Sequence, residues 1–371
     1  MNKAYKYRIY PSNEQTIIMS KTFGCVRFVY NEILTVQQNK YKNGEKHMSK
    51  IDANNYCNQI LKKEYPFLCE VDKFAITNSI FALENAYKKF FLRKGRIPKY
   101  KSKHKSKMSY TTNITGRNIE IGINFIKLPK IGIVKAKIHR VAPKGYKLKS
   151  VTVSMERDGS YYASVLYEYK DKETICFNDT NKIVGLDYKS DGLFVSSDKE
   201  ICGMPHYFRN KQPKLAKEQR RLKNKTIGSK NWKKQQRKIA VIYRNIANQR
   251  KDFLHKKSTE IANRYNIVCV ENLNMTSMAN KHFGNGKSTL DNGYGMFISM
   301  LEYKLHDRGG KLVKIGRWFP SSQICHQCGM IHAEMKNLSI RIMNCICGCR
   351  CDRDYNAAIN IKKEGISKIF N

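Results

Sequence analysis

The sequence predicts a multidomain protein of mixed α+β and α/β class. An N-terminal β-barrel interrupted by helices is expected to precede an α/β domain that carries a cysteine cluster. Three observations support this prediction: alternating patterns in residues 1–10 and 111–170, two apolar runs that each end on a carboxylate, and six cysteines between positions 325 and 351. At 371 residues the chain is long enough for two or three compact units, each with its own core.

The charge balance predicts a polyanionic partner. Lys and Arg number 70 against 30 Asp and Glu, for a formal net charge of +40. No stretch approaches the roughly 20 apolar residues of a membrane span, and the N-terminus lacks the apolar core of a signal peptide. The six cysteines outside the cluster are scattered among apolar neighbours, as is typical of a reducing compartment. We therefore expect a soluble intracellular protein of the cytoplasm that binds nucleic acid.

Residues 1–11 form the first predicted strand, and residues 12–94 a helical insertion. The strand alternates basic and aromatic residues, so Lys3, Lys6 and Arg8 are candidate phosphate contacts, although an ordinary edge strand with a charged face explains them equally well. Ser12 to Gln15 is typical of a helix start, and apolar stripes at intervals of three and four follow it as far as Leu92.

Residues 95–178 are predicted to complete the barrel. They begin with a basic segment whose aromatic residues offer stacking faces for bases, although a solvated linker is the alternative. The candidate nucleic-acid contacts in this segment are Arg96, Lys99, Tyr100, Lys101, Lys103, Lys105 and Tyr110. Alternating apolar residues then continue through a hairpin turn at Asp158 and Gly159, and polar residues 171–181 mark the domain boundary.

Residues 179–321 form the predicted α/β domain, and its strand ends carry acids. Residues 182–187 form a mainly apolar segment that ends at Asp187, and residues 265–271 form another that ends at Glu271. Asp352 and Asp354 precede a third segment with periodic apolar residues. An isolated buried carboxylate is costly, so each must be solvated, paired or bound to metal. Three carboxylates from distant segments are what a two-metal phosphodiesterase needs, because hard cations prefer oxygen ligands.

Two basic helices are predicted between residues 213 and 265, with a break near Gly228 and Ser229. The apolar residues of these helices are expected to pack against a core, and the opposite face is cationic throughout. A charge run is usually only a solvated face, but one of a single sign favours nucleic-acid contact. The candidate residues are Arg220, Arg221, Lys233, Lys234 and Arg237.

Residues 322–351 are predicted to form a zinc ribbon. Two pairs of cysteines sixteen residues apart match a four-thiolate zinc site. We assign Cys325, Cys328, Cys345 and Cys347 as ligands because Gly348 follows as a knuckle glycine would. Pairing of Cys345 with Cys349, or an iron–sulfur cluster, remains open. Residues 352–371 would then close the α/β domain, with the zinc holding Asp354 in place.

Taken together, these residues resemble the TnpB family of transposon-encoded nucleases, which are related to type V CRISPR effectors. The matching segments are GLDYKSD at 185–191, VENLN at 270–274, WFPSSQ at 318–323, the cysteine ribbon, and DRDYNAAINI at 352–361. The N-terminal layout of strand, helices and barrel is also similar. Asn272, where an acidic residue is common, and the compressed second cysteine pair depart from the family pattern.

The resemblance implies a RuvC-like, RNase H-type domain in which Asp187, Glu271 and Asp354 bind two Mg²⁺ or Mn²⁺ ions. Asp354 is chosen because it precedes Asn356 as the ligand in the family motif does; Asp352 would position the backbone. The resemblance also implies a wedge barrel, a helical recognition lobe, a transposon-derived guide RNA, and a double-stranded DNA target beside a short flanking motif.

The expected function is RNA-guided, metal-dependent DNA cleavage. A guide-directed repressor without cleavage is one alternative, but the presence of all three carboxylates argues against it. A transposase or an accessory nucleic-acid-binding protein is another. The chain shows no obvious Tyr nucleophile paired with a His-hydrophobe-His metal motif.

Overall fold

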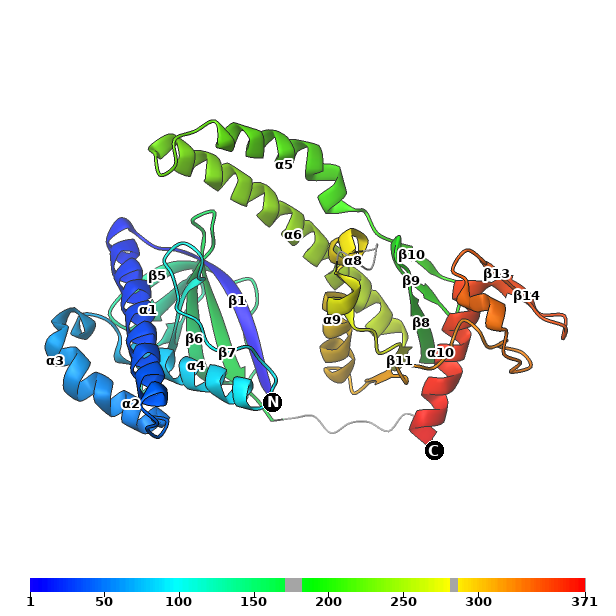
Figure 1. Cartoon of the computed structure of the whole chain (residues 1–371), viewed down its shortest axis with the longest axis horizontal. Coiled ribbons are helices and arrows are strands. Elements are labelled where there is room, and N and C mark those ends of the chain that lie inside the picture. The colour runs from blue at the N-terminus through cyan, green and yellow to red at the C-terminus, as the bar shows by residue number, and fades with distance from the viewer. Residues whose placement is uncertain (171–181, 281–285, 371) are drawn as a thin grey trace. The chain divides into compact units, whose positions relative to one another are not determined.

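The computed structural model describes residues 1–170, 182–280 and 286–370, and Figure 1 shows their elements. Contacts between residues divide the chain into two compact units, Met1–Asp171 and Lys172–Asn371. The predicted domain boundary between residues 178 and 179 lies outside the described residues. Within the described ranges, we find no helix whose length and apolar character would let it cross a membrane.

Unit 1 contains a seven-stranded antiparallel sheet in the order β2-β6-β7-β1-β5-β4-β3. Its strands are β1 Asn2–Tyr10, β2 Met108–Asn113, β3 Glu120–Ile121, β4 Phe125–Leu128, β5 Gly132–Lys137, β6 Lys147–Met155 and β7 Tyr161–Glu168. The first strand pairs with both β5 and β7, so it joins the strands of residues 108–168 in one sheet, on either side of the helices in the sequence. Among the described residues β2 and β3 are not paired with each other, so closure into a barrel stays a prediction.

The predicted helical insertion follows β1. It comprises α1 Asn13–Lys42, α2 Lys50–Tyr56, a π-helical turn Cys57–Leu61, α3 Lys62–Glu64, a 3-10 turn Pro66–Cys69 and α4 Lys73–Phe91. The start of α1 is a capping box: Ser12 Oγ accepts from the Gln15 backbone N–H, and the Gln15 side chain accepts from the Ser12 N–H. This reciprocal pairing satisfies two helix-end donors and explains why the sequence signal was reliable.

Unit 2 contains a five-stranded sheet in the order β10-β9-β8-β11-β12. Its strands are β8 Ile183–Tyr188, β9 Gly192–Ser196, β10 Ile201–Gly203, β11 Ile267–Val270 and β12 Lys311–Lys314. The neighbours β8, β11 and β12 are parallel, and β9 and β10 add antiparallel strands at the other edge. All four residues of β11 are buried, as expected for a parallel strand covered on both faces.

Helices cover both faces of this sheet. The helices of unit 2 are α5 Tyr207–Lys223, α6 Lys230–Arg264, α7 Met275–Met278, α8 Gly286–Asn292, α9 Tyr294–His306 and α10 Arg353–Phe370. Val184 and Leu186 pack with the apolar residues of α6 and α9 on one face, and Cys269 packs with Ile361 of α10 on the other. Figure 1 shows α10 running alongside β8.

The α5–α6 pair forms the predicted basic hairpin, but α5 begins at Tyr207, before the expected start at Pro213. Pro213 lies inside the helix. The break comes where predicted, with Gly228 at a φ of 85° and Ser229 capping α6. Gln235 of α6 donates to the Glu218 carboxylate at 2.6 Å and to the Glu218 carbonyl at 3.0 Å, which joins the two helices.

Candidate active site and metal centre

Asp187 and Glu271 lie at adjacent positions on two neighbouring strands. The parallel register of β8 and β11 pairs Gly185 with Cys269 and Leu186 with Val270. The next residue along each strand is Asp187 or Glu271, so both acids leave the sheet at the same edge. This is the carboxyl edge of the parallel strands, where α/β proteins commonly bind ligands.

Helix α10 brings Asp354 to the same place. A Cβ added at Gly185 would lie 2.1 Å from the Ala358 carbonyl oxygen, so the helix backbone lies directly against β8. Asp187 points to the same side as Gly185 because side chains alternate along a strand. Asp354 lies one helical turn before Ala358. The structure therefore brings the three predicted carboxylates together.

The charges of Glu271 and Asp354 both act on Asp187. Burial raises the pKa of Asp187 well above its usual value, and the charges of Glu271 and Asp354 raise it further, against an opposing effect of Arg353. Burial also raises the pKa of Glu271. Without a cation, the cluster is therefore costly to ionise fully, as expected for carboxylates that share a metal site.

Polar neighbours fix the orientation of the carboxylates. Ser321 donates to Glu271 Oε1 at 2.5 Å, and Arg341 donates to Asp354 Oδ2 at 2.6 Å. Asp352 Oδ1 accepts the backbone N–H groups of Asp354, at 2.8 Å, and of Tyr355, at 3.2 Å. Asp352 thus positions the start of α10, in agreement with the role inferred for it from the sequence.

Two buried hydroxyls adjoin this acidic cluster. The rings of Tyr188 and Tyr294 lie 4.7 Å apart, and neither hydroxyl has a hydrogen-bond partner in the described part of the chain. Burial and the charges of Asp187 and Glu271 raise the pKa of Tyr294. A buried hydroxyl without a partner is costly, so these two oxygens, with three carboxylates, fit a site that binds hard cations and polar groups.

The sequence analysis missed Tyr294, Arg341 and the role of Ser321. Ser321 lay within a matching segment but had no assigned partner. Nothing in the local pattern of Tyr294 or Arg341 distinguishes them from other Tyr and Arg residues, because their contacts depend on segments far away in the chain.

The four predicted zinc ligands converge. The Sγ atoms of Cys325, Cys328, Cys345 and Cys347 all lie within 4.8 Å of one another. Cys325 and Cys347 are 3.6 Å apart, and Cys328 and Cys345 are 3.5 Å apart. Tetrahedral thiolates at about 2.3 Å from zinc would be separated by about 3.8 Å, so this cluster fits a four-coordinate zinc ion.

Both halves of the cluster form knuckle turns. Gly329 and Gly348 have φ angles of 80° and 85°, and their N–H groups donate to the carbonyls of Cys325 and Cys345, each at 2.9 Å. Although burial opposes the effect, hydrogen bonds from the backbone N–H groups of Cys328 and Gln327 and from neighbouring thiols lower the pKa of Cys325 to about 6. The first turn therefore favours the thiolate form of Cys325, the form that a metal requires.

The ribbon itself is small. A short antiparallel pair, β13 Ile342–Asn344 and β14 Arg350–Asp352, connects the second knuckle to α10. Cys349 lies in a second group with His326 and Cys351. The assignment of Cys347 rather than Cys349 as a zinc ligand stays a prediction.

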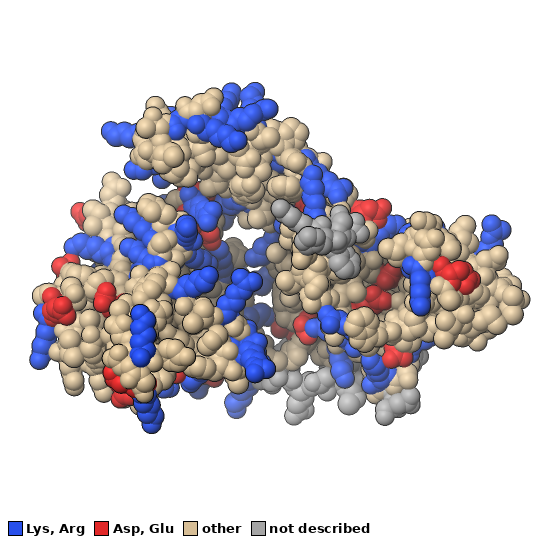
Figure 2. Space-filling view, in the orientation of Figure 1, with Lys and Arg blue, Asp and Glu red and all other residues tan. Residues whose placement is uncertain are grey.

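The predicted basic residues of the α5–α6 hairpin are exposed. Figure 2 shows Lys and Arg side chains gathered over this hairpin, at the top of the view. Arg221 is partly engaged, in an ion pair with Glu218 at 2.8 Å. The exposed candidates are Arg220, Arg221, Lys233, Lys234 and Arg237.

In unit 1 the predicted basic nucleic-acid contacts differ in how exposed they are. Arg96, Lys99, Lys103 and Lys105 are exposed. Lys101 instead places its Nζ 3.6 Å from the centre of the Tyr30 ring, and burial lowers its pKa. Such a half-buried cation is less suited to phosphate binding than its exposed neighbours.

The aromatic candidates separate in the same way. Tyr100 is 53% exposed, and its hydroxyl donates to Gln38 at 2.9 Å. The expectation that Tyr110 offers a stacking face is corrected: it is 5% exposed and packs 5.8 Å from Phe23, centroid to centroid. Tyr110 belongs to β2, whose alternation turns it towards the core.

Strand β1 carries the remaining three candidates. Lys6 is exposed and pairs with Glu156 at 3.0 Å, while Lys3 and Arg8 are half-buried. Lys6 Nζ and the Arg8 guanidinium lie 4.3 and 5.0 Å from the centre of the Tyr162 ring. The basic groups of β1 are therefore held against the sheet by local contacts.

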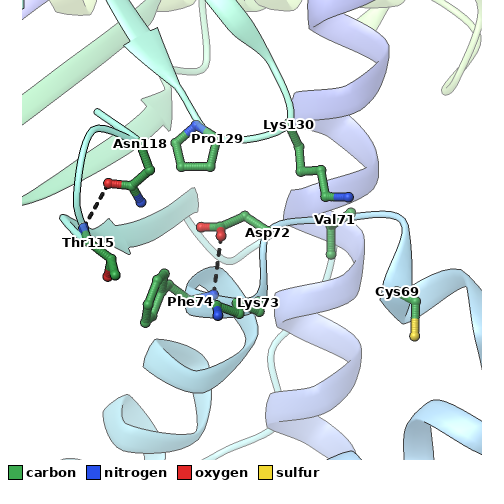
Figure 3. Close-up of a pocket in the computed structure, with 9 residues that line it drawn as sticks. All are labelled: Cys69, Val71, Asp72, Lys73, Phe74, Thr115, Asn118, Pro129 and Lys130. Carbon is green, nitrogen blue, oxygen red and sulfur yellow. Dashed lines mark hydrogen bonds between the residues drawn. The ribbon is translucent and has the colours of Figure 1, made fainter. Parts of the chain in front are cut away.

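A separate pocket of about 480 Å³ lies within unit 1 (Figure 3). Asp72 lies among its lining residues. Asp72 caps α4 by accepting from the Phe74 N–H at 3.3 Å, and its other oxygen is buried with no partner in the described residues. The other lining residues are Cys69, Val71, Lys73, Phe74, Thr115, Asn118, Pro129 and Lys130.

Three protein-family models match the chain. One described as "Probable transposase" matches residues 164–282, one described as "Helix-turn-helix domain" matches residues 1–46, and one described as "Cas12f1-like, TNB domain" matches residues 294–361. The first of these segments contains Asp187 and Glu271, and the last contains Asp354 and the cysteine cluster.

Similar proteins span the whole chain. The "Putative RNA-guided DNA endonuclease" of Streptomyces pristinaespiralis is 34% identical over 372 residues, which cover 99% of this chain and 90% of that protein. The "Putative RNA-guided DNA endonuclease InsQ" of Escherichia coli K12 is 27% identical over 381 residues, which cover 98% and 92%. A cryo-EM structure of a Cas12f1-sgRNA-target DNA complex matches with a TM-score of 0.52 at 14% identity and covers 98% of both chains, which confirms the predicted fold class.

Proposed function

The chain belongs to the TnpB family of transposon-encoded, RNA-guided DNA endonucleases, and we propose that Asp187, Glu271 and Asp354 are its catalytic carboxylates. The observation that carries this proposal is the convergence of three acids from β8, β11 and α10 at one edge of a sheet. Their mutual effect on the pKa of Asp187 supports a shared cation site. Retention of all three favours cleavage over a repressor without nuclease activity.

The metal proposed for this site is Mg²⁺, with Mn²⁺ as a substitute. Two such ions, when bound, activate a water molecule and stabilise the leaving oxygen of a phosphodiester. Ser321 holds one oxygen of Glu271 and leaves the other to bind a cation. Arg341 does the same for Asp354, and the buried hydroxyls of Tyr188 and Tyr294 are available to orient a phosphate oxygen or the attacking water.

The four-thiolate cluster is proposed to bind a structural zinc ion. Four thiolates leave no open position for chemistry, so its role is to hold the ribbon against the start of α10. Asn356 supports this coupling: it accepts from the His326 N–H at 2.9 Å and donates to the Ile324 carbonyl at 2.7 Å. Zinc binding therefore positions the helix that carries Asp354.

The proposed partners are a transposon-derived guide RNA and a double-stranded DNA target with a short flanking motif. A formal charge of +40 supports binding to polyanions but does not distinguish RNA from DNA. Pairing with the guide would read the target sequence, while the protein reads backbone shape and the flanking motif. The proposed place of action is the cytoplasm of a prokaryotic cell, where both partners occur.

The decisive experiment is to purify the chain from cells that also carry its native downstream locus and to sequence the RNA that co-purifies. The complex is then incubated with Mg²⁺ and plasmid that matches the 3′ end of that RNA. Guide-dependent linear DNA is expected, and a mismatched plasmid serves as control. Binding of the matched target without cutting would favour the repressor.

The Asp187→Ala variant tests the site assignment itself. It removes a metal ligand but no phosphate contact, so RNA and DNA binding should remain while cleavage is lost. Asp191→Ala is a matched control, because Asp191 lies beyond the end of β8 in the same matching segment. Continued cutting by Asp187→Ala would overturn the assignment.

A further inference from the structure

We propose that His326, Cys349 and Cys351 form a second metal site, which lies beside the four-cysteine site and is built from other residues. The Nδ1 atom of His326 lies 3.6 Å from Cys349 Sγ and 3.8 Å from Cys351 Sγ, and the two sulfur atoms are 3.9 Å apart. One nitrogen and two sulfur ligands therefore face one another across a space the size of one ion.

These separations agree with tetrahedral coordination. With metal–sulfur bonds of about 2.3 Å and metal–nitrogen bonds of about 2.0–2.1 Å, neighbouring sulfurs lie about 3.8 Å apart and nitrogen–sulfur pairs about 3.6 Å apart. All three observed distances lie within a few tenths of an ångström of these values. The site needs no rearrangement of the backbone to bind an ion.

The two sites use different ligands. Cys325, Cys328, Cys345 and Cys347 complete the first site by themselves, and the second group shares none of these residues. With three protein ligands, the second site has a fourth position for water. Its ion is therefore expected to exchange more readily than one closed in by four thiolates.

The ligand chemistry identifies the class of ion. Thiolate and imidazole ligands select Zn²⁺ and similar thiophilic divalent ions, whereas Mg²⁺ prefers carboxylate oxygen. The proposed occupant therefore differs from that of the carboxylate cluster. The inference rests on this geometry alone and is independent of DNA cleavage.

The site connects the ribbon to α10. Cys351 lies in β14, directly before Asp352, which caps α10. His326 Nδ1 lies 3.0 Å from the Asn356 side-chain oxygen in the first turns of that helix, so binding an ion exchanges this contact for a metal bond. The second ion would thus fasten the first knuckle to the strand that leads into α10.

Metal content tests the proposal on the full chain. The chain is purified with Zn²⁺ present and desalted, and the metals are quantified by mass spectrometry, which also detects iron. We expect two zinc ions per chain in the wild type and one in the Cys349→Ser/Cys351→Ser variant. Cys69→Ser is the matched control, since it removes an exposed thiol that belongs to unit 1 and to neither cysteine group, and it should retain two.

Cobalt titration covers the case in which the second ion dissociates during desalting. Co²⁺ should bind in two steps, and the second step, with its thiolate charge-transfer band, should be lost in Cys349→Ser/Cys351→Ser. His326→Gln should weaken that step about tenfold or more. One Co²⁺ equivalent in the wild type, or two unchanged equivalents in the double variant, would overturn the proposal.

Discussion

Gly185 is the position where a single methyl group should separate the three proposed catalytic carboxylates. The residue lies in β8 directly under α10, and a Cβ there would lie 2.1 Å from the Ala358 carbonyl oxygen and 2.7 Å from the Lys362 nitrogen. Both are backbone atoms, so no side-chain rotation relieves the overlap. In Gly185→Ala, the helix must move away from the strand.

The size of the displacement follows from the contact itself. Observed Cβ contacts are essentially never shorter than 3.0 Å, so α10 must shift by about 1 Å. Overpacking of this kind costs roughly 1–3 kcal/mol. For a unit of this size, 2 kcal/mol lowers Tm by roughly 4–8 °C. A 1 Å misplacement of Asp354 relative to Asp187 should also reduce the cleavage rate by roughly 100-fold.

The assay compares single-turnover cleavage of a matched plasmid by wild-type and variant complexes, together with thermal unfolding. Gly203→Ala is the control, because Gly203 lies in β10 of the same sheet and a Cβ there meets no atom within 4 Å. Gly203→Ala should cut at the wild-type rate. A Gly185→Ala complex that also keeps the wild-type rate and Tm would refute the proposed packing of α10 on β8.

Three further predictions concern single side chains. Asp187→Asn should raise the Tm of the chain at pH 8 when no Mg²⁺ is present. The pKa of Asp187 is raised in the folded state, so ionisation of this carboxyl lowers the folding stability as the pH rises through that pKa. The Asn amide does not ionise, so the variant does not lose this stability. Thermal unfolding without added Mg²⁺ from pH 5 to pH 8 checks this, and equal dependence of Tm on pH for both proteins would contradict it. Ser321→Ala should require about 10- to 100-fold more Mg²⁺ for half-maximal cutting, because Glu271 loses its donor; an unchanged Mg²⁺ titration would exclude this role. Asp72→Ala should lower the free energy of unfolding by about 1 kcal/mol, because α4 loses its N-cap. Asp72→Asn keeps an accepting oxygen and should lower it by less, and unfolding of the two variants in urea measures the difference.

Much of the local structure could be predicted from the sequence. The Ser12 capping box marks the start of α1, and the turn at Asp158 and Gly159 joins β6 to β7, because these signals depend on neighbouring residues alone. The start of α5 was missed because proline usually opens a helix, whereas Pro213 lies inside this one. Tyr110 was misjudged because a tyrosine on a strand suits either face.

The site was predictable in part. A carboxylate at the end of an apolar strand identifies Asp187 and Glu271 as candidates, but the sequence does not reveal that β8 and β11 are neighbours in parallel register. The contacts of Ser321, Arg341 and Tyr294 with the acids depend on this arrangement and on the packing of α10. Interactions between distant segments leave no periodic signal in the sequence.

The packing of β8, β11 and α10 also affects the chain while it folds. The three carboxylates belong to segments far apart in the chain, and contacts of this kind carry a high loop-closure cost and form slowly. A nascent or partly unfolded chain therefore has only isolated acids, which do not form the proposed cation site. The proposed catalytic site is therefore complete only in molecules that have finished folding.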